Sequence, residues 1–197
     1  MDDPRRQRED QYFLGKDRDL LDKLREDARK QAQREQLAQA AGVDAGHAVL
    51  EDLEKLGFTA PTMRVLHLAP LVAIAWADGV IQPSERELIW EAARAHGVQP
   101  DTEASQKLEK WLAARPSEEA LAKAATIIRA LIDARPENER EQSRTSLLGL
   151  CSEVAAVAGG VLGIGKVSPA EQRTLARIVG ELEKSHERAA RQVADSI

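Results

Sequence analysis

Residues 76–89 have the sequence WADGVIQPSERELI, and this stretch decides the fold of the chain. It predicts the end of one helix, a tight turn at Asp78-Gly79, and the start of a second helix at Pro83. Proline suits the first position of a helix, because its missing N–H would have no partner there. Glu85 then falls at the third position, from which its carboxylate can accept a hydrogen bond from the backbone N–H of the capping residue, Gln82. The stretch therefore predicts a helix-loop-helix unit.

A second stretch, VAGGVLGIGKVSPAEQRTL at residues 157–175, repeats the same order of signals with a longer loop. Its Ser168-Pro169-Ala170-Glu171 segment is a complete capping box, of which the first copy is a weaker version. The alignment matches Ile81 with Val167, Gln82 with Ser168, Pro83 with Pro169 and Glu85 with Glu171. Two such units predict two helical halves related by a pseudo-twofold axis, with their apolar helices packed together.

Glycine, proline and capping residues divide the rest of the chain into helices. No run of alternating polar and apolar residues bounded by turn signals predicts a strand. We therefore expect an all-α fold, a helical bundle of two pseudo-symmetric helix-loop-helix halves preceded by a charged N-terminal helix. The expected helices cover residues 18–41, 45–55, 61–78, 83–96, 118–134, 137–158 and 169–191. A further helix, capped by Asp101, carries Leu108, Trp111 and Leu112, and we expect the tryptophans to fill the core between helices.

Residues 1–42 differ in composition from residues 43–197, so we expect a charged N-terminal helical arm followed by one all-α domain. Half of residues 1–40 are charged, ten of each sign. Leu14, Leu21 and Ala28 are spaced by seven residues, but the apolar seam does not continue over three complete heptads. The arm could associate with a second copy or dock a partner, or it could pack loosely on its own domain. We favour packing on its own domain because the seam is short.

Composition argues against several classes of protein. The net charge of -5 and the pI of 5.5 argue against a nucleic-acid-binding protein, which is usually basic. The single cysteine cannot form an intrachain disulfide, so we expect a cytoplasmic location. The N-terminal sequence MDDPRRQRED lacks the apolar core of a secretion signal. The apolar run at 65–77 is too short to span a membrane, and the balanced charge of the arm does not favour acidic lipids. We expect membrane association only through a protein partner.

The segment AWADGVIQPSERELI resembles the signature of the tellurite-resistance TerB family, whose superfamily includes the N-terminal domain of the DjlA co-chaperone. The second copy, EVAAVAGGVLGIGKVSPAEQRTLARI, resembles the variant half found in members with a glycine-expanded loop. The resemblance covers residues 60–190 and leaves the N-terminal arm outside it. It implies a compact all-α bundle that binds protein partners in stress response, without an established enzymatic reaction. The chain contains no His-Pro-Asp tripeptide, so the resemblance does not extend to direct recruitment of an Hsp70-type chaperone.

Asp78 and Glu85 are the candidate metal ligands. The resemblance implies a divalent-metal site made of acidic residues, and the segment DGVIQPSE places two carboxylates and several backbone carbonyls close together in sequence. Hard cations such as Ca²⁺ and Mg²⁺ prefer such oxygen ligands. Alternatively, Asp78 stabilises the turn and Glu85 completes a capping box, which we favour because positions 80 and 81 are apolar. The second copy has Gly159 and Gly160 in place of Asp78, so we expect at most one weak metal site.

Two titratable residues interrupt apolar segments. His67 lies three helical turns before Asp78, too far to share an ion with it in an unbroken helix. We expect His67 to be half-buried with one hydrogen-bond partner. Glu153 interrupts an apolar helix face. It could be a functional acid with a raised pKa, as in a hydrolase that uses Glu153 or Asp133, but we favour a buried ion pair with an arginine such as Arg64 or Arg129.

Two further features imitate catalytic or nucleotide-binding chemistry. Residues 160–166 fit the spacing G-x-x-x-x-G-K of a phosphate-binding loop, but Val167 replaces the required Ser or Thr and the preceding segment is helical. We expect a flexible loop between helices there. Cys151 lies among apolar residues, and we expect a small buried side chain instead of a nucleophile.

No arrangement of a nucleophile with a base occurs in the sequence, so we do not expect an enzyme. The expected function is a non-enzymatic interaction or stress-response module of the TerB-like kind, linked through the resemblance to tellurite resistance. The alternative is a divalent-metal-responsive binding protein that uses the Asp78–Glu85 loop.

Overall fold

The structure is a computed structural model that describes the backbone of residues 4–42, 46–158 and 167–194, and the side chains of residue 16 and residues 18–42, 46–157 and 167–183. Within these ranges the chain forms nine α-helices, one short 3-10 helix and no strand, so the all-α prediction is confirmed. The helices are α1 (Pro4–Ala41), α2 (His47–Lys55), η1 (Ala60–Thr62), α3 (Met63–Leu66), α4 (Ala69–Ala75), α5 (Pro83–Ala95), α6 (Glu103–Ala113), α7 (Glu118–Asp133), α8 (Glu137–Ala158) and α9 (Pro169–Ala194).

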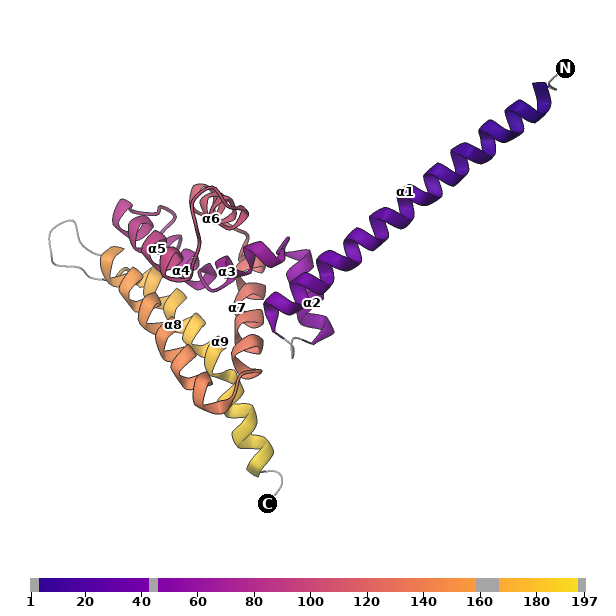
Figure 1. Cartoon of the computed structure of the whole chain (residues 1–197). Coiled ribbons are helices and arrows are strands. Elements are labelled where there is room, and N and C mark those ends of the chain that lie inside the picture. Colours follow the sequence, from indigo (N-terminus) through magenta and orange to yellow (C-terminus); the bar gives the residue numbers. More distant parts are fainter. Residues whose placement is uncertain (1–3, 43–45, 159–166, 195–197) are drawn as a thin grey trace.

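The N-terminal helix α1 projects from the body of the molecule (Figure 1). Its last turns contact the body, since Leu37 is buried in the core and the Arg34 guanidinium lies 3.6 Å from the Glu54 carboxylate. The side chains of residues 18–33 are all exposed, so the expectation that the arm packs on its own domain is wrong for these residues. Gly42 ends the helix as predicted, at a φ of 105° that favours glycine.

The apolar stretch predicted as one helix over residues 61–78 is divided into η1, α3 and α4. Proline inside a helix removes one hydrogen bond and clashes with the carbonyl four residues earlier. Pro70 therefore ends the continuity of the stretch and occupies the second position of α4 instead, where its missing N–H has no cost. The N–H of Leu68 donates to the carbonyl of Val65 at 3.0 Å, which closes the last turn after α3. The α-helix is consequently interrupted at His67 and Leu68, between α3 and α4.

Helices α4 and α5 form one hairpin, and α8 with α9 forms the other (Figure 1). Helix α4 packs against α7, α8 and α9, whereas α5 packs against α8. All seven residues of α4 are buried, because the helix is enclosed on several sides. The predicted packing of the apolar helices of the two halves against each other is therefore confirmed.

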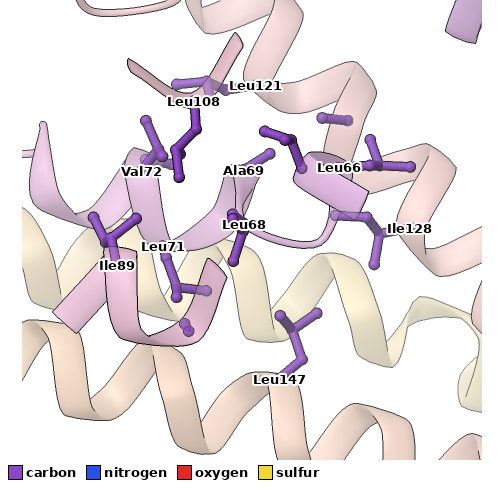
Figure 2. Close-up of a cluster of buried hydrophobic side chains, with 14 of the residues drawn as sticks. Leu66, Leu68, Ala69, Leu71, Val72, Ile89, Leu108, Leu121, Ile128 and Leu147 are labelled. Atoms are coloured by element: carbon purple, nitrogen blue, oxygen red, sulfur yellow. The ribbon is translucent and has the colours of Figure 1, made fainter. Parts of the chain in front are cut away.

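The hydrophobic core lies where these helices meet α6 and α7. Figure 2 shows Leu71 of α4 beside Ile89 of α5, above the helix that carries Leu147. Both Leu71 and Ile89 are completely buried. Burying a leucine side chain contributes about 1.5–3 kcal/mol, so this cluster supplies much of the stability of the fold.

The three tryptophans pack partly buried against this core. The indole N–H of Trp76 donates to the carbonyl of Trp111 at 2.8 Å, which joins the end of α4 to α6. The predicted cap of α6 is wrong by one residue: Thr102 caps the helix, and its hydroxyl accepts from the N–H of Ser105 at 3.2 Å. Asp101 instead occupies the left-handed region at a φ of 58°, so the chain turns there before the helix begins.

Candidate functional site

The turn between α4 and α5 contains the two predicted metal ligands in different environments. Asp78 is exposed, and its Oδ1 accepts a hydrogen bond from the N–H of Val80 at 3.1 Å. Gly79 follows at a φ of 95°, which a residue with a side chain adopts only under strain. The Asp78 side chain therefore stabilises the turn, as aspartate commonly does.

Glu85 lies at the third position of α5 and is only 1% exposed. Its Oε2 accepts a hydrogen bond from the N–H of Gln82 at 2.6 Å. This bond satisfies one of the backbone groups that a helix start leaves without a partner. The capping role predicted for Glu85 is confirmed, and the carboxylate reaches it from a buried position.

Glu171 occupies the matching place at the start of α9 and is only 2% exposed. Its Oε2 accepts from the N–H of Ser168 at 2.6 Å, and its own N–H donates to the Ser168 hydroxyl at 3.1 Å. The complete capping box predicted here is confirmed. The two aligned glutamates thus have the same helix position, the same cap bond and nearly the same burial.

The structure brings Glu85 close enough to Glu171 and Asp78 for their charges to interact. Burial is the main cause that raises the pKa of Glu85 to about 7. The hydrogen bond from Gln82 lowers this pKa, and repulsion by Glu171 and Asp78 raises it further. A carboxyl group with this pKa is partly protonated at neutral pH. The aligned positions of the two repeats therefore form a buried acidic group between the hairpins, which we call the acidic pair, Glu85 and Glu171.

The geometry of a metal site is not assembled around these residues. Among the described side chains, no three His, Cys, Asp or Glu residues lie close enough together to hold an ion. That Asp78 and Glu85 bind a metal ion therefore remains a prediction. The loop residues Gly159, Gly160 and Lys166, on which the phosphate-loop comparison depended, lie outside the described residues.

Several other sequence expectations have clear outcomes. Cys151 is completely buried, as predicted, and burial raises the pKa of its thiol to about 12.

The expectation of a buried Glu153 ion pair is wrong, because Glu153 is exposed on α8. Arg129 instead lies 2.8 Å from Glu181 of α9. A single residue in an apolar run cannot show which side of its helix faces the core, which is why the sequence misplaced Glu153.

His67 is half-buried, as expected, but the expected hydrogen bond is missing among the described residues. Its ring stacks on that of His96, with centroids 5.9 Å apart and an angle of 21° between the planes. The pairing joins the end of α3 to the end of α5. No spacing in the sequence indicates it, because the two histidines lie on separate helices.

The described part of α1 carries a second candidate site, three exposed leucines. Leu20, Leu21 and Leu24 are 57%, 52% and 56% exposed. They lie on the section of the helix that projects from the body (Figure 1). Large apolar side chains gathered at one exposed place commonly mark an interaction surface. We call these residues the leucine patch.

Comparison with known proteins identifies no relative: no family model, curated protein or solved structure matches the chain.

None of the helices in the described ranges combines the length and apolarity needed to cross a lipid bilayer.

Proposed function

We propose that this chain is a non-enzymatic interaction module that associates with another helix through the leucine patch of α1. The observation that carries the proposal is the exposure of Leu20, Leu21 and Leu24 on a section of α1, residues 18–33, whose side chains are all exposed. Removing a leucine side chain from water contributes about 1.5–3 kcal/mol, so a partner that covers all three gains several kcal/mol. The role agrees with the partner binding that the TerB-like resemblance implies.

Helix α1 is suited to hold the patch away from the body. The Lys30 ammonium lies 2.7 Å from Glu26, and the Arg25 guanidinium lies 3.3 Å from Asp22. Such pairs at a spacing of three or four residues support an exposed helix by about 0.2–0.5 kcal/mol each. A helix supported only in this way gains further stability when a second helix covers its apolar side chains.

A second copy of α1 in antiparallel orientation is the occupant that the charge pattern favours. Residues 17–22 contain three aspartates and one arginine, whereas residues 23–30 contain four basic and two acidic residues. Antiparallel pairing centred on the leucine patch places the acidic segment of each copy beside the basic segment of the other. Parallel pairing would place like charges together, which disfavours association.

Replacing Leu20, Leu21 and Leu24 together by alanine should abolish self-association of the chain. Alanine keeps the helix propensity but removes most of the buried apolar surface, so the dimer should weaken by at least about 100-fold. Sedimentation velocity or light scattering over a concentration series measures the change. Val80→Ala is the matched control, because Val80 is also exposed (60%) but lies outside α1. A wild-type chain that stays monomeric at every concentration would contradict the homodimer and leave a different protein as the occupant.

The acidic pair supports a second candidate function, a divalent-metal-responsive protein. None of Asp78, Glu85 and Glu171 forms an ion pair within the described side chains, and Glu85 is subject to repulsion from the other two. A bound cation would neutralise this charge and order the turn. The TerB-like resemblance implies the same chemistry for Asp78 and Glu85.

Thermal melting with and without Ca²⁺, Mg²⁺, Mn²⁺ or Zn²⁺ tests the metal site. A cation at about 100 times its dissociation constant should stabilise the wild type by about 2.7 kcal/mol. Asp78→Asn should remove the effect, since the amide oxygen can still accept from Val80 but carries no charge. Asp101→Asn is the control, because Asp101 is exposed on another turn. The metal function is excluded when no cation shifts the melting of the wild type.

A further inference from the structure

Two adjoining cavities lie where the ends of several helices meet, away from the acidic pair and the leucine patch. One has a volume of about 410 Å³ and borders the end of α1, and the other, of about 590 Å³, borders α8. They share His67, His96 and Arg135, and Arg64 lines the first. We call the space bounded by these four residues the cationic cleft. Its size is that of a small-molecule site.

The four basic side chains come from three separate places in the sequence. Arg64 belongs to α3, His67 follows it, His96 follows α5, and Arg135 follows α7. The stacked rings of His67 and His96 lie between the two cavities. The fold thus assembles a basic group that no local sequence pattern contains.

Neither arginine of the cleft is paired with an acidic side chain within the described residues. Burial, then repulsion by His96 and Arg135, lowers the pKa of His67 to about 4. Arg64 and Arg135 form no ion pair among the described side chains. Glu139 lines the second cavity, but it too forms no ion pair with these arginines. An anion in the cleft would therefore meet two guanidinium groups that no carboxylate occupies.

The ends of helices attract cations by themselves, because their last carbonyls carry partial negative charge. Arg64 donates one N–H to the carbonyl of Gly97 at 2.7 Å, and Arg135 donates one to the hydroxyl of Ser143 at 3.2 Å. Each guanidinium has five N–H donors, so most of them stay available. Attraction to the end of α5 accounts for the contact of Arg64, and the Ser143 hydroxyl of α8 accounts for the contact of Arg135; the remaining donors of both arginines are left for a ligand.

Gly97 holds the Arg64 side chain in its place. It has a φ of 76°, and a Cβ atom added there would overlap the Arg64 guanidinium. Only glycine therefore allows both the turn after α5 and the hydrogen bond from Arg64 to its carbonyl. Gly79 has a similar φ of 95° but no atom within 4 Å of an added Cβ. An alanine at either glycine strains the backbone, but only an alanine at position 97 also displaces Arg64. Comparing the two substitutions therefore distinguishes the effect of strain from the effect of moving Arg64.

We propose that the cationic cleft binds a small molecule through a phosphate or diphosphate group, with Arg64 and Arg135 as the main contacts. Guanidinium groups bind phosphate oxygens through paired, charge-assisted hydrogen bonds, and two of them suit a multiply charged group. His96, exposed at the mouth of the cleft, supplies a further N–H donor. The site is independent of both proposed functions.

Titration of the full-length protein with inorganic pyrophosphate, at constant ionic strength and pH 7, tests the site. The imidazole NMR signals of His67 and His96 should shift with saturation, while those of His47, which contacts Arg34 and lines neither cavity, should not. Arg64→Gln and Arg135→Gln should each weaken binding roughly tenfold or more. Arg94→Gln removes the same charge from an exposed position outside the cleft and should bind as the wild type does.

The glycine variants provide a second readout that does not alter charge. Gly97→Ala should weaken pyrophosphate binding, whereas Gly79→Ala, with comparable backbone strain, should leave it unchanged. Unshifted His47 signals show that each variant is folded. Absence of a saturable shift up to about 10 mM pyrophosphate, or equal weakening by Arg94→Gln and Arg64→Gln, would overturn the proposal. Binding of citrate without pyrophosphate would also overturn it, because the ligand class would then be a carboxylate.

Discussion

Replacing Glu85 by glutamine is expected to stabilise the protein relative to the wild type as the pH rises from about 4.5 to 7. The pKa of Glu85 is 4.5 in an unperturbed chain and about 7 in the fold, so between these values the folded state holds a proton that the unfolded state releases. The contribution of Glu85 to stability is therefore fully present below pH 4.5 and is lost as the pH rises through 7. The difference between variant and wild type should reach about 3 kcal/mol. Glutamine keeps an oxygen that can accept from Gln82.

His67 produces a dependence of the opposite sign. Its pKa falls from 6.5 to about 4 on folding, so the unfolded chain binds the additional proton between these values. This makes the fold more stable as the pH rises from about 4 to 6.5, by up to about 3 kcal/mol. In the wild type the two effects oppose each other between pH 4.5 and 6.5, and a flat profile there would conceal both.

Urea unfolding from pH 4 to 8 of the wild type, Glu85→Gln, His67→Gln and the double variant separates the two contributions. Relative to the wild type, Glu85→Gln should gain stability with rising pH, and His67→Gln should lose it. The matched variant Glu87→Gln changes an exposed glutamate two residues along α5 and should follow the wild type. A Glu85→Gln difference that stays constant from pH 4.5 to 8 would show that the buried carboxyl is not the source of the pH dependence.

Replacing Leu71 by alanine is expected to lower the free energy of unfolding by about 2–5 kcal/mol. Leu71 of α4 is completely buried beside Ile89 of α5, above the helix that carries Leu147 (Figure 2), so the substitution leaves a cavity where the two hairpins meet. Such a loss is a large fraction of the stability of a typical domain. The effect should appear as a lower midpoint in urea unfolding followed by circular dichroism.

Leu24→Ala is the matched control for Leu71→Ala. It removes the same three carbon atoms from a side chain that is 56% exposed, so in the monomer its effect should stay within about 0.5 kcal/mol. Similar losses from the two variants at a low protein concentration would contradict the assigned core. A negligible loss for Leu24→Ala would show that this leucine does not contribute to the stability of the single chain.

The capping residues show how much of the fold could be predicted. Gln82-Pro83 with Glu85, and Ser168-Pro169 with Glu171, predicted both helix starts and their cap hydrogen bonds. These interactions join residues three apart in the chain, so the sequence alone contains the information. The continuous helix expected over residues 61–78 was wrong because the clash of Pro70 with the carbonyl four residues earlier outweighs the apolar pattern.

The candidate sites depended on contacts that no local pattern contains. The sequence identified Glu85 and aligned it with Glu171, but it did not show that both are buried near each other. It separated His67 from His96 by a turn and a whole helix, and it placed Glu153 in an ion pair that does not form. Exposure of Leu20, Leu21 and Leu24 was also missed, because a charged helix with a short apolar seam can lie on a domain or project from it.

The amino-acid sequence by itself determined the helical class, the turns, and the repeated start of a helix at Pro83 and Pro169, since each depends on backbone conformation and hydrogen bonds within a few residues. Only the tertiary structure decided which side chains lost contact with water and which charges became neighbours. Those outcomes depend on how distant helices pack. Burial changes the free energy of a carboxyl or imidazole charge only after that packing is complete, which is why the acidic pair, the cationic cleft and the leucine patch became visible in the folded chain.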